Sequence, residues 1–392
     1  MCRTRNWRSP AGVHHGRLTH YHLAISLDEG SSVKKSFWRR LQSRGLTGTA
    51  RMTWFYASRF ARNSTLTKIR NFVRAKAYKR WRRDQLASMP YRYTIDPTNA
   101  CNLRCPLCPT GLGILQRDRG LLKTADFQRL IDEIAPWCYL VEMYNWGEPF
   151  LHPGIFEMIQ YAHQRKILVR LSSNLNRYSE EMAQRTVDAG LDSIIVSVDG
   201  ASQESYQQYR RRGKLETVLR NLQYLVEAKR ARNADHPLIV VRMLINRYNE
   251  HEVETLRTMI MNVGADIFVT GDLFIDTTDE AQRREWLPLS AEHSSYNYQD
   301  GGSVTQAIEN IWHCSDLWES MTINWDGGVS PCCWIHDHQN DFANAFEQPI
   351  QEIWNGDAYV SARRVFHRGG PKEGPQKVIC TECRGRPQYL KM

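Results

Sequence analysis

From residue 90 onward, the apolar positions of the chain alternate between two periods. Short runs of β-branched and aromatic residues predict strands, and segments with apolar residues every three or four positions predict amphipathic helices. The predicted strands cover residues 91–95, 139–144, 167–171, 193–198, 238–244 and 267–270. Helical periodicity fills the intervals, at residues 127–134, 155–162, 179–189, 215–226 and 253–263. This alternation predicts an α/β fold with a parallel sheet covered by helices, and six strands fit a partial (β/α)6 TIM-like barrel.

The segment before residue 90 has a different pattern. Residues 1–58 show little periodicity, and we expect them to be poorly ordered. Residues 59–86 predict a helix, because Leu66, Ile69, Val73 and Ala77 recur at helical spacing. We expect this helix to pack against the body with its basic residues in solvent. The alternative is a helix that grips a phosphate-bearing partner or a membrane surface.

Composition adds a charge asymmetry to this picture. The chain has 392 residues and a net charge of +10, and 42% of its residues are hydrophobic, which is typical of globular proteins. Its length favours two domains or more. Residues 1–90 hold 20 Lys and Arg against 3 Asp and Glu, so the excess positive charge belongs to an N-terminal extension. Ten cysteines without an export signal predict a reducing, cytoplasmic compartment and metal or redox use.

Three of these cysteines lie in the stretch "CNLRCPLC", directly after the first predicted strand. Cys101, Cys105 and Cys108 have the spacing Cys-x3-Cys-x2-Cys. Three thiolates this close can hold three irons of a four-iron cluster and leave the fourth iron open to a small molecule. A structural zinc site is the alternative, but it takes a fourth ligand at paired spacing, and the twenty residues after Cys108 contain no His or Cys.

Polar turns follow the next strands at the same predicted edge. "WGEP" contains Gly147 and Glu148, "SSN" ends at Asn174, and "SVDG" contains Ser197 and Asp199. Each turn alone is ordinary loop chemistry. In barrels of this class, however, the chemistry lies at the carboxyl ends of the strands, where all these turns converge with the thiols.

A second set of thiols lies near the C-terminus. Cys314, Cys332, Cys333, Cys380 and Cys383 come from separate segments and supply enough ligands for a closed zinc site or a second four-iron cluster. Residues 321–325 and 329–335 predict a hairpin around the turn "DGG". Adjacent residues of a strand face opposite ways, so only one of Cys332 and Cys333 is expected to join the site.

Together, "CNLRCPLC", "WGEP" and "SVDG" in this order resemble the radical S-adenosylmethionine enzymes, over about residues 91–275. The stretch "DGGVSPC" resembles the auxiliary-cluster domains called SPASM or twitch. The resemblance implies a four-iron cluster on Cys101, Cys105 and Cys108 that binds S-adenosylmethionine. Reductive cleavage of that cofactor yields a 5′-deoxyadenosyl radical, which abstracts a hydrogen atom from the substrate. An external donor of flavodoxin or ferredoxin type would supply the electron.

The resemblance also implies roles for single residues. Gly147 and Glu148 would receive the ammonium group of the cofactor, and Ser197 and Asp199 would lie near its ribose or methionine end. Two weaker expectations are Arg210, in "YRRRG", for the methionine carboxylate and Asn174 for the ribose. The resemblance also implies four ligands for the auxiliary site, namely Cys314, Cys332, Cys380 and Cys383. The family usually has a second Gly where this chain has Trp146, which predicts a narrower substrate pocket.

The expected organisation is a basic extension (1–90), a barrel (91–275), a linker (276–311) and a small auxiliary-cluster domain (312–392). The expected function is radical oxidation or rearrangement of a peptide or of a small polyol or sugar-type substrate, with the auxiliary cluster as electron acceptor. Two alternatives stay open. One is an RNA-modifying enzyme of the same chemistry, suggested by the basic extension. The other is a zinc-stabilised binding module without turnover.

Overall fold

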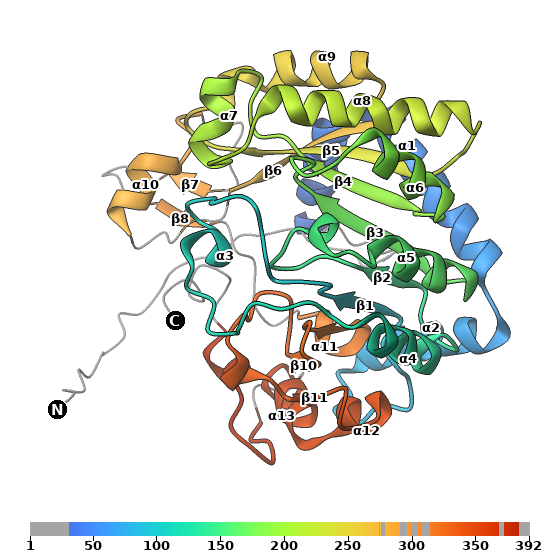
Figure 1. The fold of residues 1–392 in the computed structure, drawn as a ribbon. Helices are drawn as coiled ribbons and strands as arrows, with labels where there is room; N and C mark the ends of the chain where they lie inside the picture. Colours follow the sequence, from blue (N-terminus) through green and yellow to red (C-terminus); the bar gives the residue numbers. More distant parts are fainter. Residues whose placement is uncertain are drawn as a thin grey trace.

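The computed structural model describes residues 31–273, 275, 279–290, 296–298, 304–306, 314–367 and 372–383. Within them, nine strands form one sheet in the order β11-β10-β9-β1-β2-β3-β4-β5-β6 (Figure 1). The six strands predicted from the sequence are all present and all parallel: β1 (Arg92–Ile95), β2 (Leu140–Glu142), β3 (Leu168–Ser173), β4 (Ser193–Ser197), β5 (Leu238–Ile245) and β6 (Ile267–Asp272). The predicted α/β fold with a partial barrel is therefore confirmed.

Helices between the strands cover the outer face of this sheet. They are α4 (Thr124–Ile134), α5 (Ile155–Gln164), α6 (Glu180–Asp188), α7 (Gln203–Tyr209), α8 (Leu215–Ala231) and α9 (Val253–Val263). Their apolar faces and the outward side chains of the strands form one continuous core. α9 ends at Gly264, whose φ of +109° lies in the left-handed region that glycine adopts without strain. The sequence pattern predicted these helices except α7.

Helix α1 (Ser31–Asn63) covers the inner face of the sheet, on the side away from α5, α6 and α8 (Figure 1). Met52, Phe55 and Tyr56 pack against inward side chains of β3 to β6. The prediction that residues 31–58 lack order was therefore wrong, and residues 1–30 lie outside the described part. The periodicity is weak because α1 carries buried polar groups as well: Tyr56 lies between Ser193 (2.8 Å) and the guanidinium of Arg170.

Helix α2 (Leu66–Trp81) also differs from its prediction. The range predicted as one helix, residues 59–86, holds the end of α1 and the whole of α2. The residues that α2 buries are Lys68, Asn71 and Ala75. Leu66 is 88% exposed and Val73 is 60% exposed, so the apolar face does not pack against the body. Contacts made by the opposite side hold this orientation, and they include the ring contacts of Phe72 with Phe60 and Tyr91. The Lys68 ammonium donates to the carbonyl of Lys166, and the Asn71 side chain exchanges two hydrogen bonds with the backbone of Met89.

The C-terminal segment extends the same sheet. β9 (Ser320–Ile323) pairs in parallel with β1, and β10 (Gly328–Ser330) and β11 (Ala343–Asn344) follow antiparallel. The predicted hairpin is confirmed, but its second strand ends at Ser330 because Pro331 has no N–H for the ladder. The remaining C-terminal helices are α11 (Asp316–Glu319), α12 (Ile350–Asn355), α13 (Asp357–Val365) and the 3-10 turn η6 (Ile379–Glu382).

The segment predicted as a linker contains secondary structure. Between residues 276 and 311, the structure describes helix α10 (Glu280–Trp286) and a hairpin of β7 (Tyr296–Tyr298) and β8 (Val304–Gln306). Across the described residues, no helix is both long and apolar enough to cross a bilayer.

The Tyr56 hydroxyl yields a stability prediction. It accepts from Nε (2.9 Å) and from a second nitrogen (2.6 Å) of the buried Arg170 guanidinium. Tyr56→Phe leaves those donors without an acceptor, so we expect the free energy of unfolding to fall by about 2 kcal/mol. Trp54→Ala is the control on the same helix, since Trp54 is 76% exposed and should change stability by less than about 0.5 kcal/mol. Urea denaturation of the metal-free protein measures both, and equal stability of the two variants would contradict this account of how α1 docks.

Candidate active site

The loop that carries the first three thiols begins where β1 ends. Cys105 is buried, and Cys101 and Cys108 are partly buried. Backbone contacts shape the loop: the N–H of Leu103 points to the sulfur of Cys101 (3.5 Å), and the N–H of Cys108 donates to the carbonyl of Cys105 (3.2 Å). The short helix α3 (Pro109–Leu112) starts directly after Cys108. The three thiols therefore sit in a loop with a defined backbone, at the carboxyl edge of the sheet.

The surroundings of these thiols fit a cluster. Burial raises the pKa of Cys101 to about 12, and the Glu148 carboxyl adds to this rise. Burial also raises the pKa of Cys105 to about 11, although the Arg210 guanidinium opposes the rise. Thiols in such a place become thiolates only when a positively charged centre binds them. N–H donors already point at two of the sulfurs, since Asn174 lies 3.9 Å from Cys101 and Arg210 lies 3.8 Å from Cys105. Hydrogen bonds to sulfur are among the contacts that tune iron–sulfur clusters.

Glu148 lies beside this loop with its carboxylate fully buried. Its N–H donates to the carbonyl of Ala100 (2.8 Å), which ties the "WGEP" turn to the residue before Cys101. One carboxylate oxygen accepts from Ser173 (2.7 Å) and from the N–H of Phe150, and the other accepts from the N–H of Asn174 (2.8 Å). Burial raises the pKa of Glu148, and these hydrogen bonds oppose the rise. The second oxygen has capacity for one more donor.

Gly147 leaves no space for a side chain at this point. A Cβ added there would lie 1.8 Å from the carbonyl oxygen of Thr98. The turn that presents Glu148 therefore packs backbone against backbone on the thiol loop, and glycine is required for that approach.

Asp199 and Arg210 form a buried ion pair beside Cys105. The Nε of Arg210 donates to one oxygen of Asp199 (2.5 Å), and the other oxygen accepts from the N–H of Leu244 (2.6 Å). The structure thus separates Arg210 from Arg211 and Arg212, which are exposed. The pair places one positive charge beside a thiol, where it stabilises the negative charge of a cluster.

The two remaining predicted residues lie at the same edge. Asn174 faces the thiol loop, because its amide donates to the side chain of Asn102 (3.1 Å) as well as toward Cys101. Ser197 is buried at the end of β4. All the predicted residues of the barrel site are thus brought to one rim of the sheet.

Helix α10 contributes an apolar cover that the sequence reading missed. Trp286 and Leu287 pack with Leu103, Cys105 and Tyr209 in one small core. The helix therefore lies over the thiol loop, although nearly 180 residues of sequence lie between them. Apolar cover of this kind limits the access of water to a metal site.

The second set of thiols comes together from three segments. The thiols of Cys380 and Cys383 both interact electrostatically with Cys314, and Cys332 interacts with Cys380. Burial raises the pKa of Cys314 to about 12, and it also raises the pKa values of Cys332 and Cys380. Cys332 and Cys333 lie in a turn after β10 and not on a strand, so the predicted alternation of their side chains does not apply. Among the described residues, no three His, Cys, Asp or Glu side chains converge on the position of a single metal ion.

Polar contacts join the second set of thiols to the first. Arg117, eight percent exposed, forms ion pairs with Asp326 and Asp341 of the C-terminal hairpin. Trp146 lies edge-on to His336, with ring centroids 5.6 Å apart. The indole that replaces the usual glycine therefore fills space between the barrel rim and the C-terminal segment.

Asp96 is a candidate that the sequence reading missed. It directly follows β1, is 1% exposed, and accepts a hydrogen bond from the N–H of Trp146 (3.3 Å). Its Oδ1 atom has no hydrogen-bond partner within the described part of the chain. Burial raises its pKa to about 7. The rule that found the other polar turns, a polar residue at the carboxyl end of a strand, would have found Asp96 too.

Comparison with known protein families agrees with this geometry. Residues 95–260 match the model of the radical SAM superfamily, and residues 314–384 match that of the SPASM iron-sulfur cluster-binding domain. The two matches cover more than half of the chain. The chain belongs to the radical SAM superfamily. Its cofactors are accordingly S-adenosylmethionine and a 4Fe-4S cluster, with auxiliary iron–sulfur binding in the SPASM domain.

Individual relatives are distant. Mycofactocin maturase MftC of Mycobacterium tuberculosis is 27% identical over 298 residues, which are 72% of this chain and 74% of the relative. The AdoMet-dependent heme synthase of Methanosarcina barkeri is 27% identical over 324 residues, 74% of this chain and 89% of the relative. Among solved structures, Streptococcus suis SuiB bound to S-adenosylmethionine superposes with a TM-score of 0.54 at 14% identity, covering 74% of this chain and 71% of SuiB.

Helix α3 packs so tightly on the thiol loop that one added methyl group, at Gly111, should change how much iron the protein binds. A Cβ at Gly111 would lie 2.2 Å from the carbonyl oxygen of Cys105, so Gly111→Ala must displace the loop. We expect iron per chain after anaerobic reconstitution to fall by about four atoms. Gly113→Ala is the control in the same helix: no described atom lies within 4 Å of its added Cβ, and its φ of +73° costs only about 1 kcal/mol. Full iron content in Gly111→Ala would contradict the predicted displacement.

Asp96 predicts a pH dependence of stability. An ordinary Asp loses its proton near 3.8, whereas burial holds the pKa of Asp96 at about 7 in the folded protein. The folded state therefore binds more protons between these values, and the free energy of unfolding should fall as pH rises from 4 to 7, by about 1.4 kcal/mol per unit of pKa difference. Asp96→Asn should flatten this dependence. Urea denaturation of metal-free protein between pH 4.5 and 7.5 tests it, and parallel curves for the two proteins would rule it out.

Proposed function

We propose that this radical SAM protein oxidises a peptide substrate after abstraction of a hydrogen atom, and that its second set of thiols holds the cluster that accepts the electron. The observation that carries the proposal is the convergence of the three-thiol loop, the Glu148 carboxylate and the Asp199–Arg210 pair at one rim, next to a second group of four thiols. When bound, S-adenosylmethionine and the first cluster supply a carbon radical that can break an unactivated C–H bond.

The residues of this chain would bind and orient the cofactors. Cys101, Cys105 and Cys108 would hold three irons of the first cluster. Glu148 has capacity for one more donor on its carboxylate, which suits the ammonium group of S-adenosylmethionine. The carboxylate of the cofactor would be paired by Arg210, which is partly neutralised by Asp199 but has further N–H groups. Ser197 and Asn174 are proposed for its ribose side, and Gly147 lets the turn approach.

The proposed reaction removes two electrons and two protons from the substrate. The substrate loses a hydrogen atom to the 5′-deoxyadenosyl group, then one electron to the second cluster and one proton to water, so it is oxidised by two electrons. Methionine and 5′-deoxyadenosine leave as products. Cys314, Cys332, Cys380 and Cys383 would ligate all four irons of the second cluster, which leaves no open iron for substrate. An external donor of flavodoxin or ferredoxin type would reduce the first cluster, and its oxidised form would take the electron back from the second cluster, so that S-adenosylmethionine is the net oxidant.

A peptide is favoured as the substrate by the relatives. Mycofactocin maturase is a similar protein, and SuiB, which shares the fold, has a structure bound to its precursor peptide SuiA. The AdoMet-dependent heme synthase is also similar to this chain, so a small molecule is the alternative class of substrate. The RNA alternative has lost part of its support, because Arg59, Lys76 and Lys79 of the basic extension form ion pairs with carboxylates of the body.

Variants that remove each set of thiols test the two sites separately. We expect about eight irons per chain in the wild type and about four in each of two variants, one with Ala at Cys101, Cys105 and Cys108, the other with Ala at the four auxiliary cysteines. Only the first variant should lose the reductive cleavage of S-adenosylmethionine. The second should still form 5′-deoxyadenosine but no oxidised product. About four irons in the wild type would remove the electron-acceptor role, and bound zinc without iron would overturn the enzymatic function.

Deuterium transfer identifies the substrate class. Extract of the source organism grown in deuterated medium is separated into a peptide fraction and a small-molecule fraction, and each is incubated with the reduced enzyme and unlabelled S-adenosylmethionine. Mass spectrometry should then find deuterium in 5′-deoxyadenosine with the peptide fraction. Transfer from the small-molecule fraction alone would contradict the peptide proposal and leave the radical chemistry standing.

A further inference from the structure

Helix α2 packs Phe72 and Ala75 against the body and exposes a second apolar side. Leu66, Ile69 and Val73 are 88%, 44% and 60% exposed, whereas Lys68 and Asn71 are buried. Buried polar contacts hold this orientation. The Lys68 ammonium donates to a backbone carbonyl at 2.6 Å, and the Asn71 amide pairs with both backbone groups of Met89. The helix cannot turn its apolar side inward without breaking these contacts.

The exposed apolar residues form a stripe, which we call the α2 stripe: Leu66, Ile69 and Val73. Their spacing of three and four residues places them on one line along the helix. Trp81, at the end of the helix, is 60% exposed. A row of exposed aliphatic side chains on a helix marks a surface that contacts something apolar, since scattered single residues are normal but rows are not.

The segment of the chain that carries the α2 stripe has charges of one sign. From Gly30 to Arg83 the chain has 16 Lys and Arg and no Asp or Glu. Some of these cations belong to the body, such as Lys76 and Lys79, which pair with Glu319. Arg70 and Arg74 are exposed, and each follows a stripe residue by one position, so they run along the flank of the stripe. The surface that covers α2 must therefore be apolar and negatively charged.

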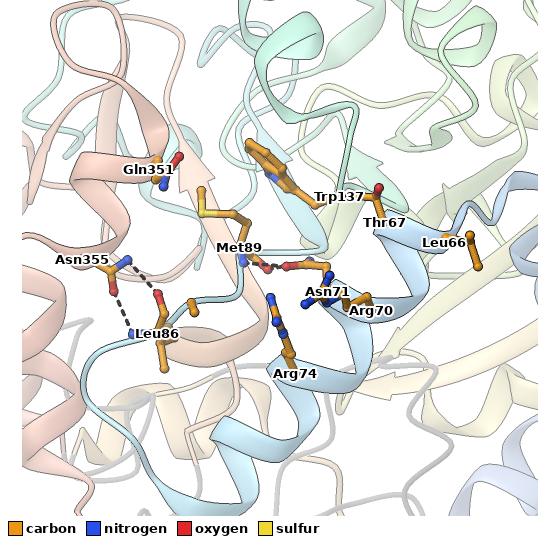
Figure 2. A pocket seen from close by; sticks show the side chains of 11 residues that line it. Leu66, Thr67, Arg70, Asn71, Arg74, Leu86, Met89, Trp137, Gln351 and Asn355 are labelled. Atoms are coloured by element: carbon orange, nitrogen blue, oxygen red, sulfur yellow. Dashed lines mark hydrogen bonds between the residues drawn. The ribbon is translucent and has the colours of Figure 1, made fainter.

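A hollow lies along the same flank. It has a volume of about 390 Å³, and its lining includes Leu66, Arg70, Arg74, Met89 and Trp137. Figure 2 shows Leu66, Arg70 and Arg74 along α2, with Trp137 and Met89 across from them. The hollow places two guanidinium groups beside apolar walls. A phosphate group that carries an apolar chain has matching chemistry.

We propose that the α2 stripe and its flanking arginines dock this protein onto a bilayer that contains anionic lipids. The helix would lie in the headgroup layer, with the stripe toward the acyl chains and the arginines at the phosphates. A nucleic acid would use the arginines but not three aliphatic side chains. A second copy of the chain would bring arginine rows of like charge together. In Figure 1, α2 lies on the side of the molecule away from α3, so docking would leave the thiol loop open to substrate.

Vesicle co-sedimentation tests the proposal with the reconstituted full chain. We expect binding to vesicles of phosphatidylcholine and phosphatidylglycerol in equal parts and little binding to phosphatidylcholine alone. Binding should weaken as the salt concentration rises from low to physiological ionic strength, because salt screens the attraction between the arginines and the lipid phosphates. Free glycerol phosphate at millimolar concentration should not compete, since it lacks acyl chains. Equal binding to both kinds of vesicle, or to neither, would overturn the proposal.

Two paired variants separate the apolar part of the surface from its charge. Arg70→Gln with Arg74→Gln should weaken binding about 25-fold, at about fivefold per arginine. Ile69→Gln with Val73→Gln should weaken it at least about tenfold, because the stripe no longer inserts. Matched controls are Arg220→Gln, an exposed arginine of α8, and Leu289→Gln, an apolar residue that is 72% exposed. Both controls should bind as the wild type does.

Iron content and circular dichroism verify that each variant is folded, and SAM cleavage should be unchanged because no variant touches the rim. Loss of vesicle binding in the arginine pair alone would show that the stripe does not insert, and it would refute the proposal. A molecular mass that rises with protein concentration in the wild type, but not in the variant with Ile69→Gln and Val73→Gln, would identify a second copy of the chain as the occupant. That result would also refute the bilayer proposal. Vesicle binding tests the bilayer proposal independently of the substrate proposal, which the deuterium-transfer experiment tests.

Discussion

The parallel pairing of β1 with two neighbours places both sets of thiols in one region. β1 pairs with β2 on one side, from Arg92 to Thr94, and with β9 on the other, from Arg92 to Ile95. The loop that carries Cys101 and the hairpin that leads to Cys332 therefore leave adjacent strands, although they are far apart in the sequence. Arg92 reinforces this junction through ion pairs with Asp316 (3.0 Å) and Glu142 (3.8 Å), one from each flanking segment.

Buried charge defines how the two thiol regions meet. Arg117 extends from the segment after the thiol loop to Asp326 and Asp341, and the Asp199–Arg210 pair lies beside Cys105. Buried ion pairs are costly to desolvate, so they add little net stability, but breaking one partner leaves an unpaired charge. They therefore hold one arrangement of the loops and exclude others. That rigidity suits a site whose work is to position a cofactor and substrate.

The N-terminal helices divide their positive charge between two tasks. Arg51 and Arg59 of α1 pair with carboxylates at the starts of the strands, and Lys76 and Lys79 of α2 pair with Glu319. These contacts close the end of the barrel opposite the thiols. The exposed arginines of α2 remain directed outward, beside apolar side chains that the body does not cover. One helix thus anchors to the protein with Lys68, Asn71, Phe72 and Ala75, and exposes a second apolar side to the surroundings.

Local patterns determined the strands and the thiol motif from the sequence alone, because strand periodicity and the spacing of three ligands within eight residues are properties of short segments. The polar turns were predictable for the same reason, and Asp96 was within reach of that rule. Only the tertiary structure decided which face of α2 is buried, that α1 covers the inner face of β3 to β6, and that Arg210 leaves its exposed run for Asp199. Each of these outcomes depends on partners distant in the sequence, whose hydrogen bonds and charges override the local apolar pattern.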